Sequence, residues 1–536
     1  MGEWPPDYVR AMKSAEFFPH PVEAVRLRET HISWVFLTGS YVYKVKKPVK
    51  LDFLDFSTLE KREYFCRREV ELNRRLTSGV YLDVVPITQD GARFNLAGEG
   101  QPVEYAVKMR QLADGDSLKR LLPDNEIEPS TIELLALTLA RFYREAESGS
   151  EIDRFGSWEI IQKNCVENFG QVADHADTDG IDHRRLRIVE AATRGFLDRH
   201  RDLFAGRVQA GQIRDCHGDL RTDHVYLTDR GIQIIDGIEF NRRFRYGDVA
   251  GDLAFLAMEL DHHGYPHVAG TLMSAFARHF DDHQLFSLLD FYKCYRAMVR
   301  LKVACLRLRQ TDIEDEERAA LKEAIGRYTQ LAYRYAMQFS RPTLWVVCGL
   351  MATGKSTLAR ALADSLSIEP IRSDLVRKRL FKSSDREGGA TDFGSGIYSQ
   401  EATSLTYARL LLLAQVELEK GRSVVLDATF SRKDQRREAL RLAEEMGAWI
   451  IFVQCTCSEA TIRKRLLART DDNSLSDARI QHLDRHQTAF EKMDDLSSPC
   501  LIRLDTERPV EGSLGAILAT ISSPNDCLER GWLSSD

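Results

Sequence analysis

Hydrophobic and polar positions near the start of the chain alternate first with the short period of β-strands and then with the longer period of a helix. Residues 31–47, HISWVFLTGSYVYKVKK, form two β-rich runs joined by a Thr-Gly-Ser turn and predict a hairpin. A polar helix is predicted over 57–76, with Ser57 as its N-cap, and residues 102–112 predict another strand. The pattern therefore predicts a small, sheet-rich lobe over about residues 1–112.

The pattern changes twice more along the chain. Helical periodicity dominates to about residue 338, interrupted by short β-rich runs over 224–240. Beyond Pro342, which ends the preceding helix, apolar runs such as LWVVCGL and SVVLDATF alternate with amphipathic helices, as is typical of a parallel α/β sheet. We therefore expect an α+β bilobal domain over 1–338 (second lobe 113–338), an α/β domain with a parallel sheet over 339–525, and a polar tail over 526–536.

Composition narrows the class of protein. The 536 residues include 81 acidic and 74 basic side chains, a formal net charge of −7, which argues against a broad nucleic-acid-binding surface but leaves room for a local basic groove. The first residues carry charges and prolines where a signal peptide needs an apolar run, and no stretch approaches the roughly 18 apolar residues of a membrane span. The ten cysteines are scattered, as expected of reduced structural thiols. We expect a cytoplasmic protein without membrane association.

The strongest motif is GLMATGKST, which matches the phosphate-binding pattern G-x-x-x-x-G-K-[ST] between an apolar strand and a helix. Its backbone N–H groups would surround the phosphates of ATP at a helix N-terminus. Lys355 would reach the β- and γ-phosphates as a catalytic residue, and the Ser356 hydroxyl would bind Mg²⁺. The expected nucleotide-binding residues are Gly349, Ala352, Thr353, Gly354, Lys355, Ser356 and Thr357.

The following segment, IEPIRSDLVRKRLF, predicts a short strand, then Ser-Asp, then a helix. It resembles the small P-loop kinases that include polynucleotide kinase, zeta-type toxins and gluconate kinase. The resemblance implies that Asp374 orients the acceptor hydroxyl as a general base and that Arg377 binds the acceptor. A carboxylate suits this role because phosphoryl transfer depends on orientation more than on basicity. The alternative is that Asp374 only caps the helix.

Two further features complete this expected site. SVVLDATF places Asp427 at the end of an apolar strand, a position suited to a Mg²⁺-bound water or a substrate hydroxyl. Arg465 and Arg469 are spaced i, i+4 on a predicted helix and share one face of it. In the kinases that this region resembles, a helical lid carries such arginines over the phosphates, where they offset transition-state charge. A solvated basic helix face is the alternative.

The first part of the chain carries a second candidate site. HGDLRTDHVYL is followed by IIDGIEF, which places Asp219, His224 and Asp236 at the spacing of a kinase catalytic loop and metal loop. These motifs resemble aminoglycoside-phosphotransferase-like kinases, and the whole chain resembles bacterial fusions of such a domain with a P-loop kinase. The resemblance implies that Asp219 orients a hydroxyl, Asp236 and the residue at 224 bind Mg²⁺, and Lys44 binds the ATP phosphates. The predicted helix offers Glu69 as the partner of Lys44, with Glu71 as the second choice.

The motif departs from the family pattern at position 224, where histidine replaces asparagine, and at position 221, where arginine stands in place of the usual histidine. Imidazole is a poor ligand for Mg²⁺, which prefers oxygen. Three interpretations follow. The site uses one Mg²⁺ on Asp236, or Asp223 reaches the metal, or the site binds a ligand without efficient catalysis.

Together these features predict an α+β bilobal protein-kinase-like domain followed by an α/β P-loop domain, with ATP and Mg²⁺ as cofactors. The expected activity is transfer of the ATP γ-phosphate to a hydroxyl of a sugar-like or nucleotide-like small metabolite. Alternatives are a C-terminal kinase regulated by an N-terminal pseudokinase, a kinase acting on nucleic-acid 5′-hydroxyls, and nucleotidyl transfer from the kinase-like half. The sequence gives no expectation for the oligomeric state.

Overall fold

The structure is a computed structural model. It describes residues 5–51, 53–123, 127–174, 180–282, 284–310, 313–366, 368–381, 399–468, 483–496 and 500–508, together with Val510, Leu514 and Ile517. Contacts divide the chain into two compact units, Met1–Glu167 with Arg201–Tyr265 and Asn168–His200 with Pro266–Asp536. The domain boundary expected near residue 339 falls inside the second unit.

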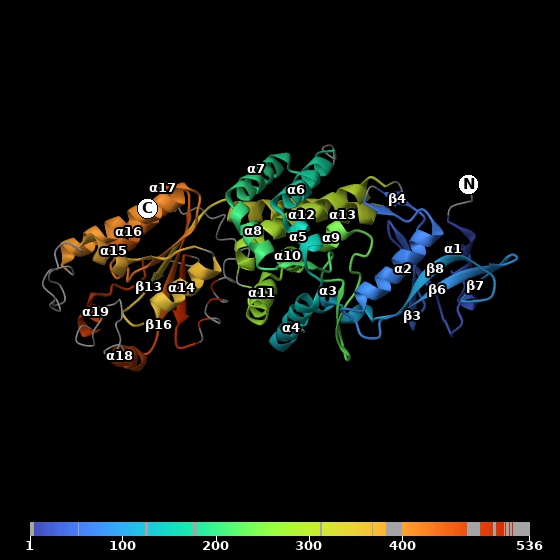
Figure 1. The fold of residues 1–536 in the computed structure, drawn as a ribbon, viewed down its shortest axis with the longest axis horizontal. Coiled ribbons are helices and arrows are strands. Elements are labelled where there is room, and N and C mark those ends of the chain that lie inside the picture. The colour runs from blue at the N-terminus through green and yellow to red at the C-terminus, as the bar shows by residue number, and fades with distance from the viewer. Residues whose placement is uncertain are drawn as a thin grey trace. The chain divides into compact units, whose positions relative to one another are not determined.

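The first unit begins with a six-stranded antiparallel sheet in the order β1-β2-β3-β8-β6-β7 (Figure 1). Its strands are β1 (Arg26–Glu29), β2 (Ser33–Leu37), β3 (Tyr41–Lys46), β6 (Tyr81–Asp90), β7 (Arg93–Leu96) and β8 (Gln101–Arg110). The predicted hairpin is β2 and β3, which pair with Val35 opposite Lys44, and the predicted strand at 102–112 is β8. The sheet-rich lobe is therefore confirmed.

Helix α2 (Leu59–Asn73) packs on this sheet through Cys66 and Val70. Its N-cap is Thr58, whose hydroxyl accepts a hydrogen bond from the backbone N–H of Lys61, so the prediction of Ser57 is wrong by one residue. The Ser57 hydroxyl instead donates to Asp55 in the preceding turn, which removes it from the cap. The polar helix still presents one buried stripe to the sheet, as its spacing predicted.

The rest of the first unit is mainly helical. Its elements are α1 (Asp7–Ala11), α3 (Leu118–Leu121), α4 (Pro129–Glu145), α5 (Ser150–Asp153), the first part of α6 (Trp158–Ala173), α8 (Arg201–Gln209), α9 (Arg242–Arg245) and α10 (Val249–His262), with the short pairs β4 (Lys50–Leu51) and β5 (Leu54–Asp55), β9 (Ile213–Asp215) and β12 (Tyr246–Asp248), and β10 (Val225–Thr228) and β11 (Gly231–Ile234). Helix α10 is buried from Val249 to Asp261. The segment between β9 and β10 carries the candidate catalytic loop.

In the part of the second unit that the structure describes, four complete helices precede a parallel sheet. The helices are α7 (His183–Arg199), α11 (Pro266–Phe280), α12 (Leu285–Leu308) and α13 (Asp315–Phe339). The rings of Phe196, Phe291 and Phe339 meet where α7, α12 and the end of α13 pack together, with the Phe196 ring centroid 4.9 Å from that of Phe291 and 5.2 Å from that of Phe339. The chain then passes Pro342 and enters the sheet, as the sequence predicted.

The five strands of this sheet are all parallel and follow the order β14-β15-β13-β16-β17. They are β13 (Thr343–Cys348), β14 (Ile371–Arg372), β15 (Val424–Asp427), β16 (Trp449–Thr456) and β17 (Leu501–Asp505), and the helices are α14 (Lys355–Ser365), α15 (Ser373–Leu380), α16 (Gln400–Glu419), α17 (Lys433–Glu445), α18 (Glu459–Ala468) and α19 (Leu483–Ala489). After β13 the chain forms β14 and β15 on one flank of this central strand, and it then forms β16 and β17 on the opposite flank. Ligands bind beyond the carboxyl ends of the strands at such a switch point.

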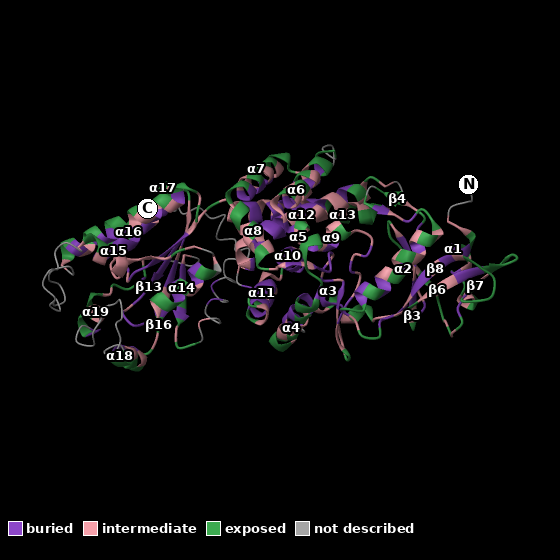
Figure 2. Ribbon diagram, viewed as in Figure 1, coloured by how far each residue is buried: buried purple, intermediate pink, exposed green. Residues whose placement is uncertain are grey.

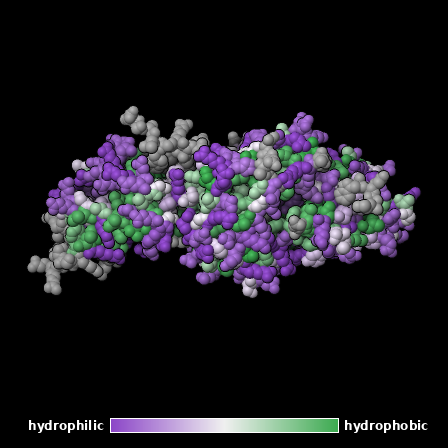
Figure 3. Space-filling model, turned by 90° about the horizontal axis from the view of Figure 1, so that it is seen from above, coloured by the Kyte–Doolittle hydropathy of each residue, from purple (hydrophilic) through white to green (hydrophobic). Residues whose placement is uncertain are grey.

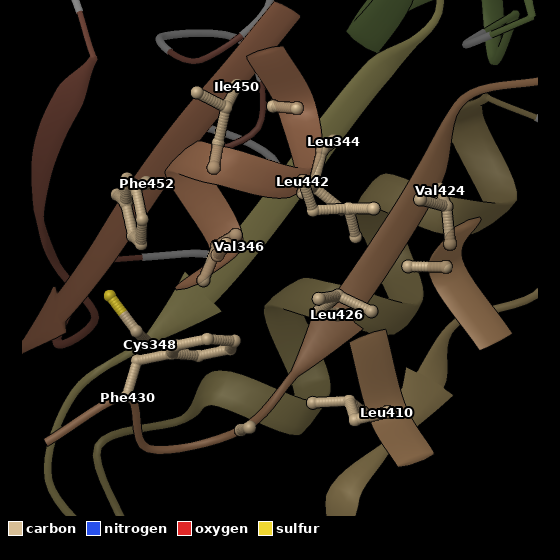
Figure 4. Close-up of a cluster of buried hydrophobic side chains, with 14 of the residues drawn as sticks. Leu344, Val346, Cys348, Leu410, Val424, Leu426, Phe430, Leu442, Ile450 and Phe452 are labelled. Atoms are coloured by element: carbon tan, nitrogen blue, oxygen red, sulfur yellow. The ribbon is translucent and has the colours of Figure 1, made fainter. Parts of the chain in front are cut away.

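The central strands are buried on both faces, which explains their continuous apolar runs (Figure 2). Leu344, Val346 and Cys348 of β13 face α16 and α17 in the cluster drawn in Figure 4. The alternate residues, Trp345 and Val347, pack against the apolar side of α14. Packing on both faces fixes the position of the loop that follows β13.

Polar side chains cover most of the face seen in Figure 3, with apolar side chains in smaller groups between them. In the part of the chain that the structure describes, no helix combines the length and apolar character needed to cross a membrane.

Candidate active sites

The P-loop directly follows the central strand β13. Gly349 and Gly354 have φ values of 128° and 87°, and Ala352, at 57°, also lies in the left-handed region. A Cβ atom on Gly349 would lie 2.4 Å from the carbonyl oxygen of Cys455, so only glycine fits there. Helix α14 begins at Lys355 and directs its free N–H groups at the loop. A glycine-containing loop before a helix N-terminus is typical of anion-binding sites, and the motif predicts such a site here.

Lys355 lies at the start of α14, and its Nζ donates a hydrogen bond to the carbonyl oxygen of Leu350, 2.6 Å away. Burial lowers the pKa of this lysine, while the nearby carboxylates of Asp427 and Asp374 act in the opposite direction. The three groups therefore lie within electrostatic reach of one another. Together they bring one cation and two carboxyl groups to the region of the P-loop.

Asp374 and Asp427 come from adjacent strand ends, because Arg372 of β14 pairs in register with Asp427 of β15. The Nε atom of Arg372 lies 3.4 Å from a carboxylate oxygen of Asp427. Asp374 follows Ser373 inside α15, whose N-cap is Arg372, so the alternative that Asp374 caps the helix is wrong. Burial raises the pKa of Asp374, and the charge of Asp427 raises it further. Asp374 is half-buried, and a carboxyl whose pKa is raised by a second carboxyl is typical of catalytic sites.

The oxygen atoms here fit Mg²⁺. The Ser356 hydroxyl in the first turn of α14 and the Asp427 carboxylate at the end of β15 are hard oxygen ligands, which this ion prefers. Arg377 is buried on α15, with its Nη1 atom 3.3 Å from the hydroxyl of Thr403 on α16. Arg377 and Asp374 therefore lie on the same short helix, which follows the edge strand β14.

Arg465 has a more specific set of contacts than its spacing predicted. Its guanidinium donates to the carbonyl oxygens of Ala352 and Thr506, at 3.3 and 2.8 Å. The Thr506 hydroxyl in turn donates to the carbonyl of Thr353, 2.6 Å away. Arg465 therefore joins the P-loop to the segment after β17, a role that sequence reasoning missed because Thr506 belongs to no motif. Arg469 lies outside the described residues.

In the first unit, the structure brings Lys44, Glu69 and Asp236 together. Lys44 Nζ lies 2.8 Å from Glu69 Oε1 and 2.8 Å from Asp236 Oδ1. Glu71, the second choice as partner, points outward and pairs with Arg68. Burial alone would raise the pKa of Asp236, but the Lys44 ammonium holds it below its usual value.

A second lysine of β3 completes this network. Lys46 is fully buried, with its Nζ 2.6 Å from Glu69 Oε2, and it also pairs with Glu239. Burial would lower the pKa of Lys46, yet these two carboxylates raise it above its usual value. The sequence contains a signal for this residue, since positions 44 and 46 of a strand face the same side. Glu239 ties the metal-loop segment to the sheet through Lys46.

The backbone of the metal loop is held from helix α2 and strand β6. Asp236 has a φ value of 63°, which a non-glycine residue adopts at a cost and typically at functional sites. Its N–H donates to the hydroxyl of Tyr81 at 3.2 Å, and the N–H of Gly237 donates to Asn73 Oδ1 at 2.8 Å. These contacts aim the Asp236 carboxylate towards Lys44.

The candidate catalytic loop is fixed by a buried carboxylate. Asp252 on α10 accepts hydrogen bonds from the backbone N–H groups of His217 and Gly218, at 2.8 and 2.9 Å, and from the hydroxyl of Tyr143 at 2.9 Å. Gly218 has a φ of 86°, and a Cβ there would meet the Phe244 carbonyl at 2.8 Å. A buried carboxylate on α10 therefore holds the backbone of the candidate catalytic loop.

His224 does not offer a free ligand to a metal ion. Its Nδ1 lies 2.9 Å from the carbonyl oxygen of Asp219, and its Nε2 lies 3.0 Å from Nη2 of Arg221. The carbonyl accepts only if Nδ1 carries the proton, so the Nε2 lone pair is left to accept from arginine. Asp236 fits a Mg²⁺ ion, whereas His224 does not. Among the described residues, no group of three or more His, Cys, Asp or Glu side chains is placed to hold a metal ion.

Comparison with known proteins gives the family. The uncharacterized protein Rv2004c of Mycobacterium tuberculosis is 33% identical over 500 residues, which cover 92% of this chain and 96% of the relative. The protein Mb2027c of Mycobacterium bovis matches to the same extent. The chain belongs to this family. Because the match spans both the kinase-like and the P-loop parts, the fusion of the two is a property of the family.

Residues 344–493 also match a family model described as an AAA domain. This segment contains the P-loop, both candidate carboxylates and α18. The predicted P-loop domain is confirmed by this match and by the parallel sheet. The predicted bilobal kinase-like architecture is confirmed by the antiparallel sheet with α2 and by the helical elements that follow it.

The chain is also similar to solved structures of kinases. A choline/ethanolamine kinase family protein from Mesorhizobium loti is 13% identical, with 61% of this chain and 98% of that chain covered and a TM-score of 0.35. A gluconokinase from Sinorhizobium meliloti is 19% identical, with 35% of this chain and 98% of that chain covered and a TM-score of 0.26.

Proposed function

We propose that this protein is an ATP-dependent phosphotransferase with two phosphoryl-transfer modules, each acting on a hydroxyl of a small sugar-like or nucleotide-like metabolite. The observation that carries the proposal is the position of Asp374 and Asp427 near Lys355, at the carboxyl ends of the adjacent strands β14 and β15. A cation for the phosphates, a metal-binding carboxylate and a second carboxyl near the reacting group are the parts that phosphoryl transfer needs.

The C-terminal module is the principal catalyst in this proposal. Lys355 and the N–H groups at the start of α14 bind the ATP phosphates, while Ser356 and Asp427 would hold Mg²⁺, which supplies charge neutralisation when bound. Asp374 orients the acceptor hydroxyl and receives its proton. Arg377, buried on the same helix, binds the acceptor.

The N-terminal module is proposed to act similarly through Asp219, with Lys44 on the ATP phosphates. The observation that supports it is the Lys44, Glu69 and Asp236 network, which holds the phosphate-binding lysine against a metal-binding carboxylate. Two modules in one chain suit two consecutive phosphorylations, or the transfer of a product from one site to the other.

A second candidate function is a C-terminal kinase regulated by an N-terminal module that binds nucleotide without transferring phosphate. The contact between Arg221 and His224 favours it, because that contact occupies the side chain at the expected metal-binding position. The two proposals differ in whether ADP formation that depends on Asp219 persists when Lys355 is replaced.

The test is ³²P-labelled ATP incubated with a metabolite extract and with the full chain, as wild type, Lys355→Ala and Asp219→Ala. We expect two labelled products, one lost in each variant. If both variants lose the same single product, the two-module proposal fails. If only Lys355→Ala has an effect, the regulatory candidate is correct, and if no metabolite is labelled by the wild type, the phosphotransferase proposal fails.

A further inference from the structure

The candidate catalytic loop of the first unit contains a cation of its own. The guanidinium of Arg221 lies among the loop's polar groups, with Nη2 3.1 Å from Asp223 Oδ2 and 3.0 Å from His224 Nε2, and with Nε 3.4 Å from Asp219 Oδ2. Its side chain is largely buried, with 15% of its surface exposed. The guanidinium therefore occupies the space that these three side chains enclose.

In kinases with two Mg²⁺ ions, the residue at the position of His224 is an asparagine that binds the second ion. Here that residue instead accepts a hydrogen bond from arginine and is fixed from behind by the Asp219 carbonyl. Its Nε2 is 3.9 Å from Asp236 Oδ2, so Arg221 and Asp236 approach the same nitrogen. A divalent ion at this point would have to displace the guanidinium and would gain only an imidazole nitrogen, which Mg²⁺ disfavours.

The charges of the surrounding groups call for a cation. Asp219, Asp223 and Asp236 bring three carboxylates to the site, and Lys44 is already paired with Asp236 and Glu69. Without a further positive charge, these carboxylates would repel a polyphosphate. A guanidinium is always charged, and its fixed fork of N–H donors matches phosphate oxygens.

We propose that Arg221 replaces the second Mg²⁺ ion, so that the N-terminal site binds ATP with one divalent cation, on Asp236, and with Arg221 held by His224 and Asp223. The inference rests on the proposed nucleotide binding of this module. His224 is a positioning residue in this arrangement rather than a metal ligand. The site would thus bind one metal ion fewer, while the Arg221 guanidinium offsets the charge of the surrounding carboxylates.

The test counts Mn²⁺ ions per bound nucleotide by electron paramagnetic resonance and equilibrium dialysis, with a non-hydrolysable ATP analogue. The full chain is used with Lys355→Ala, which weakens binding at the P-loop. We expect one Mn²⁺ per nucleotide in this chain, and two after Arg221→Ala and His224→Asn are added together. Two Mn²⁺ ions per nucleotide before those changes would overturn the inference alone. No nucleotide bound at this site would overturn both the inference and the N-terminal part of the proposed function.

Single substitutions provide a second readout. We expect Arg221→Met to weaken analogue binding at this site by roughly ten- to hundredfold, the usual effect of losing a charged hydrogen bond. Arg221→Lys, which keeps the charge, should retain more affinity than Arg221→Met. Arg230→Met removes an exposed arginine from the neighbouring turn and should leave affinity unchanged. Unchanged affinity in a folded Arg221→Met chain, checked by circular dichroism, would show that the arginine is not the missing cation.

Discussion

Lys44 Nζ lies 2.8 Å from Asp236 Oδ1, although 192 residues separate the two in the sequence. The contact joins strand β3 to the metal loop and leaves the lysine shared between Asp236 and Glu69. In the proposed function, a phosphate group arriving at this site would meet a lysine already held in position. This arrangement allows a direct test of the N-terminal module.

We expect Lys44→Met to weaken binding of an ATP analogue to the first unit by at least tenfold, because it removes a charge-assisted contact of about 1.5–3 kcal/mol and leaves two neighbouring carboxylates unopposed. Isothermal titration of the full chain carrying Lys355→Ala measures the effect. The exposed Lys50 on β4 provides the control as Lys50→Met. Equal affinities for the two variants would mean that Lys44 does not contact nucleotide.

Replacing the buried Lys46 tests how much its ion pairs stabilise the same region. We expect Lys46→Met to destabilise the packing of α2 on β3 by about 3–5 kcal/mol, because the carboxylates of Glu69 and Glu239 then remain buried without their cation. Hydrogen exchange of peptides from α2 and β3, followed by mass spectrometry, should show a loss of protection of at least roughly a hundredfold. Adding Glu239→Gln should recover part of the protection. A double variant no better than Lys46→Met would contradict the pairing.

Asp374 gives a prediction about pH. Its pKa is raised in the folded state by burial and by Asp427, so ionising it costs more free energy in the folded chain than in the unfolded one. This cost is absent below the unfolded value of about 3.9 and appears as the pH rises through the raised value. The neutral substitution Asp374→Asn should therefore raise the unfolding midpoint at pH 7.5 but not at pH 3.5, by about 2–4 °C per kcal/mol gained.

The same Asp374→Asn variant should lose phosphoryl transfer at the P-loop site, so that stability rises while activity falls. Calorimetry at the two pH values and the labelled-ATP assay measure the two effects. Asp364→Asn changes an exposed carboxylate on α14 and should alter neither. A midpoint that falls at pH 7.5, or transfer that persists, would exclude Asp374 as a catalytic carboxyl with a raised pKa.

The kinetics of an Arg465→Ala variant distinguish an arginine that supports the P-loop from one that contacts the transition state. Its contacts with the carbonyls of Ala352 and Thr506 predict that Arg465→Ala loosens the P-loop and raises KM for ATP by roughly tenfold, with a smaller effect on kcat. An arginine that closes over the phosphates in the transition state would instead lower kcat by about 10³–10⁵. Arg463→Ala, which removes an exposed pair with Glu459, is the matched control. A large fall in kcat at constant KM would support the lid role.

Local patterns sufficed for the parts of the fold that short segments define. The hairpin of β2 and β3, the strand before the P-loop and the buried stripe of α2 all follow from periodicity, which reflects how side chains alternate on a strand or recur on a helix. The N-cap of α2 was missed by one residue because Ser57 and Thr58 are equally suitable caps. The competing hydrogen bond of Ser57 to Asp55 decided between them.

Candidate chemistry was predictable where one motif carries it, as in the P-loop, and less so where it depends on distant contacts. Nothing local distinguishes Arg465 as a contact of the loop backbone, because Thr506 follows it by 41 residues. The role of Lys46 likewise depends on its ion pair with Glu239, which lies 193 residues away in the sequence. Such pairs form because whole helices and strands pack together, so no fixed spacing in the sequence predicts them.

The sequence by itself determined the order of the two parts, the identity of the phosphate-binding loop, and the presence of Asp219, His224 and Asp236 at kinase spacing. These are properties of short segments whose residue types fix their own backbone or charge. The tertiary structure decided which side chains share a charge: Lys44 with Asp236, Lys46 with Glu239, and Arg221 with His224. Electrostatic interactions fall off with distance in space rather than along the chain, so only the folded arrangement could assign these pairs.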